Sequence, residues 1–220
     1  MTSAVSPPEP DTRCRIVETA ERFFRTFGYQ KTTVADIAKA LKMSPANVYR
    51  FFESKKAINE AVAERLMREV EGAIDALARG PGSAASRLRA MIATMHRMNA
   101  ALYTDDLRMH EMVETALSES WQVVHGHIER KGAIFERVVR EGIESGEFAP
   151  ADPVLASRCV QVALLRFFHP AMIVQCAAEP GPTLDQMAEF VIGGLRCPDR
   201  LAGGDAATVL PGPRSGARNP

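Results

Sequence analysis

Apolar residues recur at spacings of three and four along most of this chain, and no segment sustains the alternation expected of a half-buried strand. Spacings of three and four place side chains on one face of an α-helix. Gly, Pro and capping residues divide the pattern into segments. The expected helices span about 12–27, 34–41, 45–51, 55–78, 84–103, 105–117, 119–145, 152–177 and 183–195. The sequence therefore predicts an all-α protein.

Two of the expected helices have particularly clear apolar faces. The first begins at Asp11 or Thr12 and ends at Gly28, a residue suited to helix termination. Its predicted buried face is Ile16, Ala20, Phe23, Phe24 and Phe27. The fourth begins after Ser54, ends at "RGPGS" (79–83), and carries the stripe Ile58, Val62, Leu66, Val70, Ile74 and Leu77. At 1.5 Å per residue it would be a strut of about 35 Å, long enough to link two domains.

Two short helices at 34–41 and 45–51 are joined by "KMS", the spacing of a helix-turn-helix. In that motif the second helix enters the major groove of DNA and the first crosses the backbone. Thr33 begins a capping box, "TVAD", and Ser44 caps the next helix with Pro45 at its first position. Since many helical proteins contain close helix pairs, the spacing needs support from the surrounding residues.

The second helix of this pair has one apolar and one polar side. Val48 and Phe52 share a face that should anchor it, with Phe51 at the edge. Asn and Arg can bond bidentately to adenine and guanine, small residues permit close approach, and helix amino termini favour phosphate. The predicted DNA-contacting residues are Thr33, Ser44, Pro45, Ala46, Asn47, Tyr49, Arg50 and Lys55.

Charge is distributed unevenly along the chain. The formal net charge is zero, yet residues 12–58 hold ten Lys and Arg against four Asp and Glu, and the remainder holds 17 against 23. A local positive field attracts polyanions whatever the average charge. The alternative to a nucleic-acid-binding surface is a basic helical face that contacts only water. The charge distribution favours nucleic acid as the partner of this first region.

Residues 16–66 resemble the DNA-binding domain of the tetracycline-repressor (TetR) family of bacterial regulators. The central stretch is "AERFFRTFGYQKTTVADIAKALKMSPANVYRFFESKKAI", in which the matching positions are Gly28, Tyr29, Thr33, Tyr49, Phe52, Ser54 and Lys55. The resemblance implies a homodimer that reads a pseudo-palindromic operator. It also implies a divergent second domain that binds a small effector and dimerises through its last two long helices.

Two positions depart from the family pattern. Lys42 stands in the turn where the family commonly has Gly, and a left-handed conformation there would cost roughly 1 kcal/mol. Phe51 stands where the family often has His, so a phosphate contact from that position is not expected. Both departures leave the operator sequence open.

We expect four regions in the chain. They are a flexible arm at 1–10, a helix-turn-helix DNA-binding domain at 11–58, a larger helical effector-binding and dimerisation domain at 59–197, and a disordered tail at 198–220 rich in Gly, Pro and Ala. The four cysteines form no CxxC pair, the start lacks a signal-peptide pattern, and no apolar run reaches about 18 residues. A reduced, cytoplasmic protein without a cofactor is the expectation.

The larger domain is rich in methionine, with five of the ten between positions 91 and 112. Flexible thioethers suit pockets for varied apolar ligands, although they also fill irregular cores. Inward positions of helix 119–145 are expected to be Trp121, Val124, Ile128, Phe135, Val138 and Val139. The candidate effector-pocket residues are Met91, Met95, Met98, Trp121, Val124 and Phe135.

Helix 152–177 is apolar on nearly every side and therefore needs cover all round, which a dimer supplies more readily than a monomer. Together with helix 183–195 it could form half of an intersubunit four-helix bundle.

Other functions remain open from sequence. His110 and Glu114 lie four apart on one helical face and could bind a metal, so a helical metal-binding sensor is an alternative. A helical enzyme would need paired Glu-x-x-His motifs, which the sequence does not contain. A scaffold without sequence-specific DNA binding is a third possibility. The leading interpretation is a ligand-responsive transcriptional regulator, most often a repressor by family resemblance, and not an enzyme.

Overall fold

The computed structural model describes residues 11–104, 112, 115, 121–149 and 152–197. Every regular element in those ranges is a helix, which confirms the all-α class. The helices are α1 (Thr12–Phe27), α2 (Val34–Ala40), α3 (Pro45–Tyr49), α4 (Lys55–Ala78), α5 (Ala84–Thr104), α7 (Trp121–Glu144), α8 (Pro153–Ala163), α9 (Leu165–Phe168), α10 (Pro170–Gln175) and α11 (Leu184–Leu195). The predicted arm 1–10 and tail 198–220 lie outside the described residues, as does most of the predicted helix 105–117.

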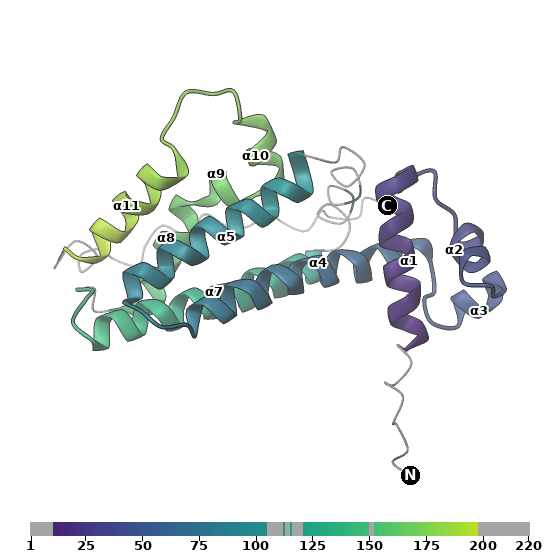
Figure 1. Ribbon diagram of the computed structural model, residues 1–220, viewed down its shortest axis with the longest axis horizontal. Coiled ribbons are helices and arrows are strands. Elements are labelled where there is room, and N and C mark those ends of the chain that lie inside the picture. Colours follow the sequence, from purple (N-terminus) through teal and green to yellow (C-terminus); the bar gives the residue numbers. More distant parts are fainter. Residues whose placement is uncertain (1–10, 105–111, 113–114, 116–120, 150–151, 198–220) are drawn as a thin grey trace, which may run out of the picture.

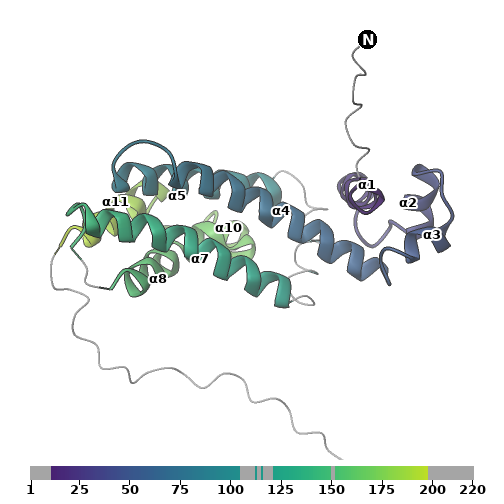
Figure 2. The same ribbon diagram turned by 90° about the horizontal axis from the view of Figure 1, so that it is seen from below.

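The molecule is elongated, with α1, α2 and α3 gathered at one end (Figure 1). From there α4 runs into the larger bundle and packs along both α5 and α7. The view in Figure 2 shows the same arrangement from below, with α8 lying against α7. One continuous helix therefore belongs both to the group of short amino-terminal helices and to the larger bundle.

The amino-terminal core is built by the helices that the apolar pattern predicted. Ile16 and Phe24 of α1, Ile37 of α2 and Val48 of α3 have no exposed surface. Burial of side chains of this size contributes about 1.5–3 kcal/mol each. Ile58, Val62 and Leu66 from the first half of α4 complete this core. The same cluster also contains Met112 and Ile173, which come from the distant part of the chain.

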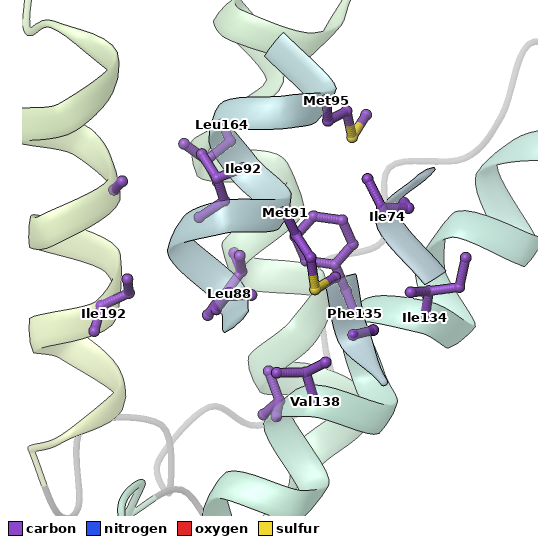
Figure 3. Packing of buried hydrophobic residues seen from close by; sticks show 14 of the residues in the cluster. Ile74, Leu88, Met91, Ile92, Met95, Ile134, Phe135, Val138, Leu164 and Ile192 are labelled. Carbon is purple, nitrogen blue, oxygen red and sulfur yellow. The ribbon is translucent and has the colours of Figure 1, made fainter. Parts of the chain in front are cut away.

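A second core fills the larger bundle. Figure 3 shows Met91 of α5 beside Phe135 of α7 and on the side toward Ile74 of α4, while Leu88 and Ile92 lie on the side of α5 toward Ile192 of α11. The second half of the predicted α4 stripe, Val70 and Ile74, lies in this cluster, and Leu77 packs against it. The stripe of α4 thus serves both cores in succession.

The single helix predicted at 152–177 is wrong. The chain forms α8, α9 and α10 instead, with breaks at Leu164 (φ −95°, ψ 5°) and His169 (φ −82°, ψ 128°). Pro170 accounts for the second break, because proline has no N–H to donate and disfavours helical geometry in the residue before it. A continuous apolar helix is therefore replaced by three shorter ones.

Two residues expected to face inward are exposed. Ile128 of α7 is 44% exposed. The side chain of Gln161 in α8 lies against Gly132, one turn beyond Ile128, and α8 ends two residues later. The helix that would have covered Ile128 thus stops short. Phe27, in the last turn of α1, is 51% exposed and contacts Phe23, with ring centroids 5.3 Å apart, instead of the core.

Candidate DNA-binding surface and effector domain

The turn between α2 and α3 has the form of a helix-turn-helix. Leu41 ends α2, Lys42 adopts φ 55°, and the backbone N–H of Met43 donates to the carbonyl of Ala38 at 3.0 Å. Lys42 is the single described residue other than glycine with a positive φ. A lysine in this region of φ carries a cost of about 1 kcal/mol, as the departure from Gly indicated.

Both helices of the motif have the predicted amino-terminal caps. The Thr33 hydroxyl accepts from the backbone N–H of Asp36 (3.1 Å), and the Asp36 carboxylate accepts from the backbone N–H of Thr33 (2.9 Å). The Thr33 hydroxyl also donates to that carboxylate at 2.6 Å, and these hydrogen bonds lower the pKa of Asp36. The Ser44 hydroxyl accepts from the N–H of Asn47 at 3.2 Å. Such caps fix where each helix begins.

The candidate recognition helix, α3, packs against the rest of the domain through one of its faces. Val48 is fully buried and Phe52, just beyond the helix, is 3% exposed. Tyr49 and Arg50 lie on the exposed side, and Asn47 is half-buried with its amide nitrogen 3.9 Å from a methionine sulfur. The predicted residues Ser44, Pro45 and Ala46 are also exposed. The structure thus brings the predicted contacts at 44–50 onto one surface segment.

Lys55 is already engaged with its own domain. Its ammonium donates to the carbonyl of Gln30 at 3.2 Å and lies 4.3 Å from the ring centroid of Tyr29. The Tyr29 ring in turn meets Phe24 edge to face, with centroids 5.3 Å apart. Lys55 therefore ties the start of α4 to the loop before α2, a structural contact that the spacing of the motif did not indicate.

A groove of about 480 Å³ separates the end of α3 from α4 and the first turn of α7. Phe51, which lines it, is 39% exposed, and Val123 lines the α7 side. The Arg13 guanidinium stacks over the Phe52 ring at 4.4 Å. Arg13 and Phe51 thus contribute to the boundary between α3 and the larger bundle, a role that sequence reasoning missed.

The structure places some of the predicted effector-pocket residues in the core of the bundle and others outside it. Met91, Met95 and Phe135 are fully buried in the core of the bundle, and Met98 packs against it from a partly buried position. Val124 is buried but lies outside that cluster. The side chain of Trp121 is outside the described residues. Figure 3 shows the Met91 sulfur beside the Phe135 ring.

Charged residues between α4 and α7 form a cluster that sequence reasoning missed. Glu71, 6% exposed, accepts from Nε of Arg130 and bonds to Nδ1 of His127, both at 2.8 Å. Burial alone would raise the pKa of Glu71, but the hydrogen bonds from Arg130 and His127 outweigh it and lower that pKa. Burial lowers the pKa of His127, and the neighbouring charges of Lys131 and Arg130 lower it further.

A second pair continues this interface one turn along. Asp75 of α4 accepts from Arg137 of α7 at 2.6 Å and from Arg79 at 2.9 Å. The hydrogen bond from Arg137 lowers the pKa of Asp75. No short motif indicates the contacts between α4 and α7, because each of them joins residues more than fifty positions apart and depends on the register between two long helices.

A polar contact on α4 joins it to a distant part of the chain at the amino-terminal core. Asn59, 1% exposed, donates from its side-chain amide to the carbonyl of Met112 at 3.4 Å. Met112 and Ile173 lie in the amino-terminal core, as noted above. The bundle therefore contacts the helix-turn-helix domain directly, in addition to the connection through α4.

The residues proposed for a metal site, His110 and Glu114, lie outside the described residues. Within the described ranges no three His, Cys, Asp or Glu side chains gather as a metal site would require. Across the same ranges, no helix combines the length and apolar character needed to cross a membrane.

Two family descriptions match this chain. Residues 16–62 match "Bacterial regulatory proteins, tetR family" and residues 84–188 match "Tetracyclin repressor-like, C-terminal domain". An uncharacterized HTH-type transcriptional regulator, YhgD of Bacillus subtilis (strain 168), is 23% identical over 154 residues, covering 67% of this chain and 77% of YhgD.

Solved structures share the fold. A TetR/AcrR-family regulator from Thermobifida fusca YX-ER1 superposes with a TM-score of 0.60 at 24% identity, covering 87% of this chain and 100% of that one. FadR from Bacillus subtilis, in complex with stearoyl-CoA, gives a TM-score of 0.58 at 19% identity over 83% and 96% of the two chains. With the capped helix-turn-helix and both family descriptions in agreement, this chain belongs to the TetR family of DNA-binding transcriptional regulators.

Proposed function

We propose that this protein is a homodimeric repressor that leaves a pseudo-palindromic operator when a small effector binds its larger domain. The observation that carries the proposal is the position of α4, whose apolar stripe packs in both cores. A ligand that shifts the bundle would move the amino terminus of α4, and with it the helix-turn-helix. Two recognition helices must lie about 34–36 Å apart to read successive major grooves, so a modest shift suffices to lose the operator.

We assign the DNA contacts to the exposed segment at α3. Asn47 and Arg50 would read base edges in the major groove, with Pro45 and Ala46 allowing close approach. Thr33, Ser44, Tyr49 and Lys55 would contact phosphates. For Lys55 this requires the ammonium to exchange or share its contact with the Gln30 carbonyl.

The homodimer would form through α8 and α11. These helices contact each other and carry large exposed apolar side chains, among them Val162 at 72% and Phe190 at 75% exposure. Leu155 of α8 and Leu165 of α9 extend the same apolar character. Water-exposed apolar area of this kind is typical of a subunit interface. A second copy packed on these side chains would supply the cover that the apolar segment 152–177 was expected to need.

The effector would bind between α4, α5 and α7, near Met91, Met95, Met98 and Phe135. FadR, a relative in fold, was solved with stearoyl-CoA, which supports a small-molecule ligand for the corresponding domain here. We assign no catalytic residues, and we expect the protein to act in the cytoplasm.

Selection of DNA from a randomised pool by the purified protein tests this function. The proposal expects enrichment of an inverted repeat whose half-site centres lie about one helical turn, roughly 10 base pairs, or a multiple of it apart. Light scattering of the complex should give an even number of chains per duplex. A pool that shows no enriched sequence would favour a scaffold that does not read DNA.

A further inference from the structure

Lys131 is a cation inside the bundle without a compensating charge among the described residues. It lies on α7, is partly buried, and has its ammonium 5.9 Å from the ring centroid of Phe168 in α9. No ion pair joins it to a described carboxylate, and burial lowers its pKa to about 8. Lysines taken out of water are normally paired, since an isolated charge is costly there. An anion bound beside Lys131 would compensate this charge.

His169 supplies a second nitrogen at the same place. It joins α9 to α10, and its Nδ1 is buried without a hydrogen-bond partner among the described residues. Burial and the nearby charge of Lys131 lower the pKa of His169, so its ring is neutral at physiological pH and retains one N–H donor. A buried ring nitrogen left without a partner is uncommon in folded proteins.

The neighbouring polar groups are already committed. Nδ1 of His96 lies 2.9 Å from the carbonyl of Phe167, and the Asn99 amide donates to the carbonyl of Phe168 at 2.9 Å. His127, one turn before Lys131, bonds to Glu71. The side chains of Lys131 and His169 therefore remain without a hydrogen-bond or ion-pair partner among the described residues.

The ring beside the Lys131 ammonium, Phe168, belongs to the apolar core of the bundle. Phe168 packs against Phe135, with ring centroids 6.2 Å apart, and Leu164 is fully buried in the same core. A ligand that complements this site has one anionic group and an apolar body.

We propose that Lys131 and His169 form the head-group subsite for an effector that is an organic carboxylate. The Lys131 ammonium would donate to one carboxylate oxygen and the His169 ring N–H to the other. This inference rests on the proposed function and names the chemical class of its effector.

The site also has a direct route to the DNA-binding domain. The His169 carbonyl accepts from the backbone N–H of Ile173 at 3.0 Å, and Ile173 lies in the amino-terminal core. A carboxylate that moves His169 would displace α10 and the contact of Ile173 with that core. The effector would then act on the helix-turn-helix through α10 as well as through α4.

The first arm of the test needs no ligand. Lys131→Met removes the uncompensated charge, so the ligand-free protein should unfold at a temperature roughly 2–4 °C higher than the wild type. Arg140→Met is the matched control, because Arg140 is an exposed cation on the same helix, paired with Glu136. It should give no increase. A lower unfolding temperature for Lys131→Met would mean that the Lys131 charge is already stabilised within the chain, and it would overturn the proposal.

The second arm compares carboxylates with their neutral amides. Octanoate, benzoate and phenylacetate are each titrated beside octanamide, benzamide and phenylacetamide, by thermal shift and by release of the selected DNA. At least one carboxylate should bind about tenfold or more tightly than its amide, which corresponds to one charge-assisted contact. The preference should disappear in Lys131→Met, persist in Lys131→Arg and weaken in His169→Phe.

Three results would overturn the subsite: equal binding of the two members of every pair, no binding by any carboxylate, or an unchanged preference in Lys131→Met. DNA binding by the ligand-free wild type distinguishes failure of the carboxylate subsite from failure of the proposed function. Sequence-specific DNA binding without a carboxylate preference would reject only the subsite. Absence of sequence-specific DNA binding would reject the proposed function, and thermal shift would still report on the subsite.

Discussion

The helix-turn-helix region and the helical bundle use polar residues in opposite ways. In the described region α1–α3 no charged side chain is buried, polar side chains such as Thr33 and Ser44 cap helices, and the interior is apolar except for the uncharged Thr19 and Thr32. In the bundle, charged and ionisable groups lie between helices, as with Glu71, His127 and Lys131. A rigid reader of DNA benefits from a uniform core. A domain that responds to a ligand benefits from buried charges whose balance a ligand can change.

The largest expected effect follows from breaking the buried cluster of the bundle. Glu71→Ala leaves Arg130 and His127 without their shared acceptor, which should lower the free energy of unfolding by about 3 kcal/mol. Urea unfolding followed by circular dichroism measures it. Glu69→Ala is the control, since Glu69 is an exposed carboxylate on the same helix. Equal small losses for both variants would mean that the cluster does not hold α4 to α7.

A somewhat smaller effect is expected on the DNA-binding side. Arg50→Ala and Asn47→Ala should each weaken binding to the selected operator by about 1–3 kcal/mol, because each removes contacts to base edges. Binding to scrambled DNA should change much less. Lys39→Ala is a useful comparison, since Lys39 is an exposed cation on α2. If Arg50→Ala and Lys39→Ala reduce binding to both DNAs alike, Arg50 contacts backbone and not bases.

The turn of the helix-turn-helix offers a gain of stability. Lys42→Gly relieves the left-handed backbone at φ 55° and should raise the free energy of unfolding by about 0.5–1 kcal/mol, after allowing for the greater freedom of glycine in the unfolded chain. Lys39→Gly, within α2, should instead destabilise by about 1 kcal/mol. The same urea experiment measures the free energy of unfolding of both variants. Destabilisation by Lys42→Gly would mean that the lysine side chain makes a compensating contact.

The smallest effect expected is a dependence of stability on pH that originates in the bundle. His127 has its pKa lowered from 6.5 and Glu71 from 4.5, so folding disfavours protonation of both. Stability is therefore retained above pH 6.5, falls first as His127 is forced to protonate, and falls further below pH 4.5 as Glu71 does. His169, whose pKa is also lowered, adds to the first loss.

Replacing His127 tests this assignment. His127→Gln can still donate to Glu71 but does not titrate, so its urea midpoint should fall less than that of the wild type between pH 6.5 and 5. Identical profiles would place the acid sensitivity elsewhere. His125→Gln is the matched control, because His125 is exposed on the same helix.

The amino-terminal helices could be predicted from sequence because their signals are local. The capping box at Thr33, the cap at Ser44 and the start of α4 after Ser54 all involve residues within three positions of each other. The departure from Gly at Lys42 raised a left-handed conformation only as a condition, and φ 55° meets that condition. The predicted burial of Phe27 was wrong because an apolar residue in the last turn of a helix can lie beyond the edge of the core.

The bundle was predicted less well because its determinants are not local. The break at Pro170 was missed when apolar composition was given more weight than the missing N–H. The break at Leu164, where α8 ends, was missed as well, and Ile128 was therefore wrongly expected to be buried. The contacts of Glu71 with His127 and Arg130 depend on the register of α4 against α7. The assignments of DNA contacts and of pocket methionines stay predictions.

The measurement that tests the central claim most directly is fluorescence anisotropy of the selected operator and a scrambled duplex across a salt series. The account predicts that the operator binds at least about a thousandfold more tightly, that affinity falls steeply with salt, and that Arg50→Ala loses most of the difference. Equal affinity for both duplexes at every salt concentration would contradict a protein that reads DNA sequence through α3.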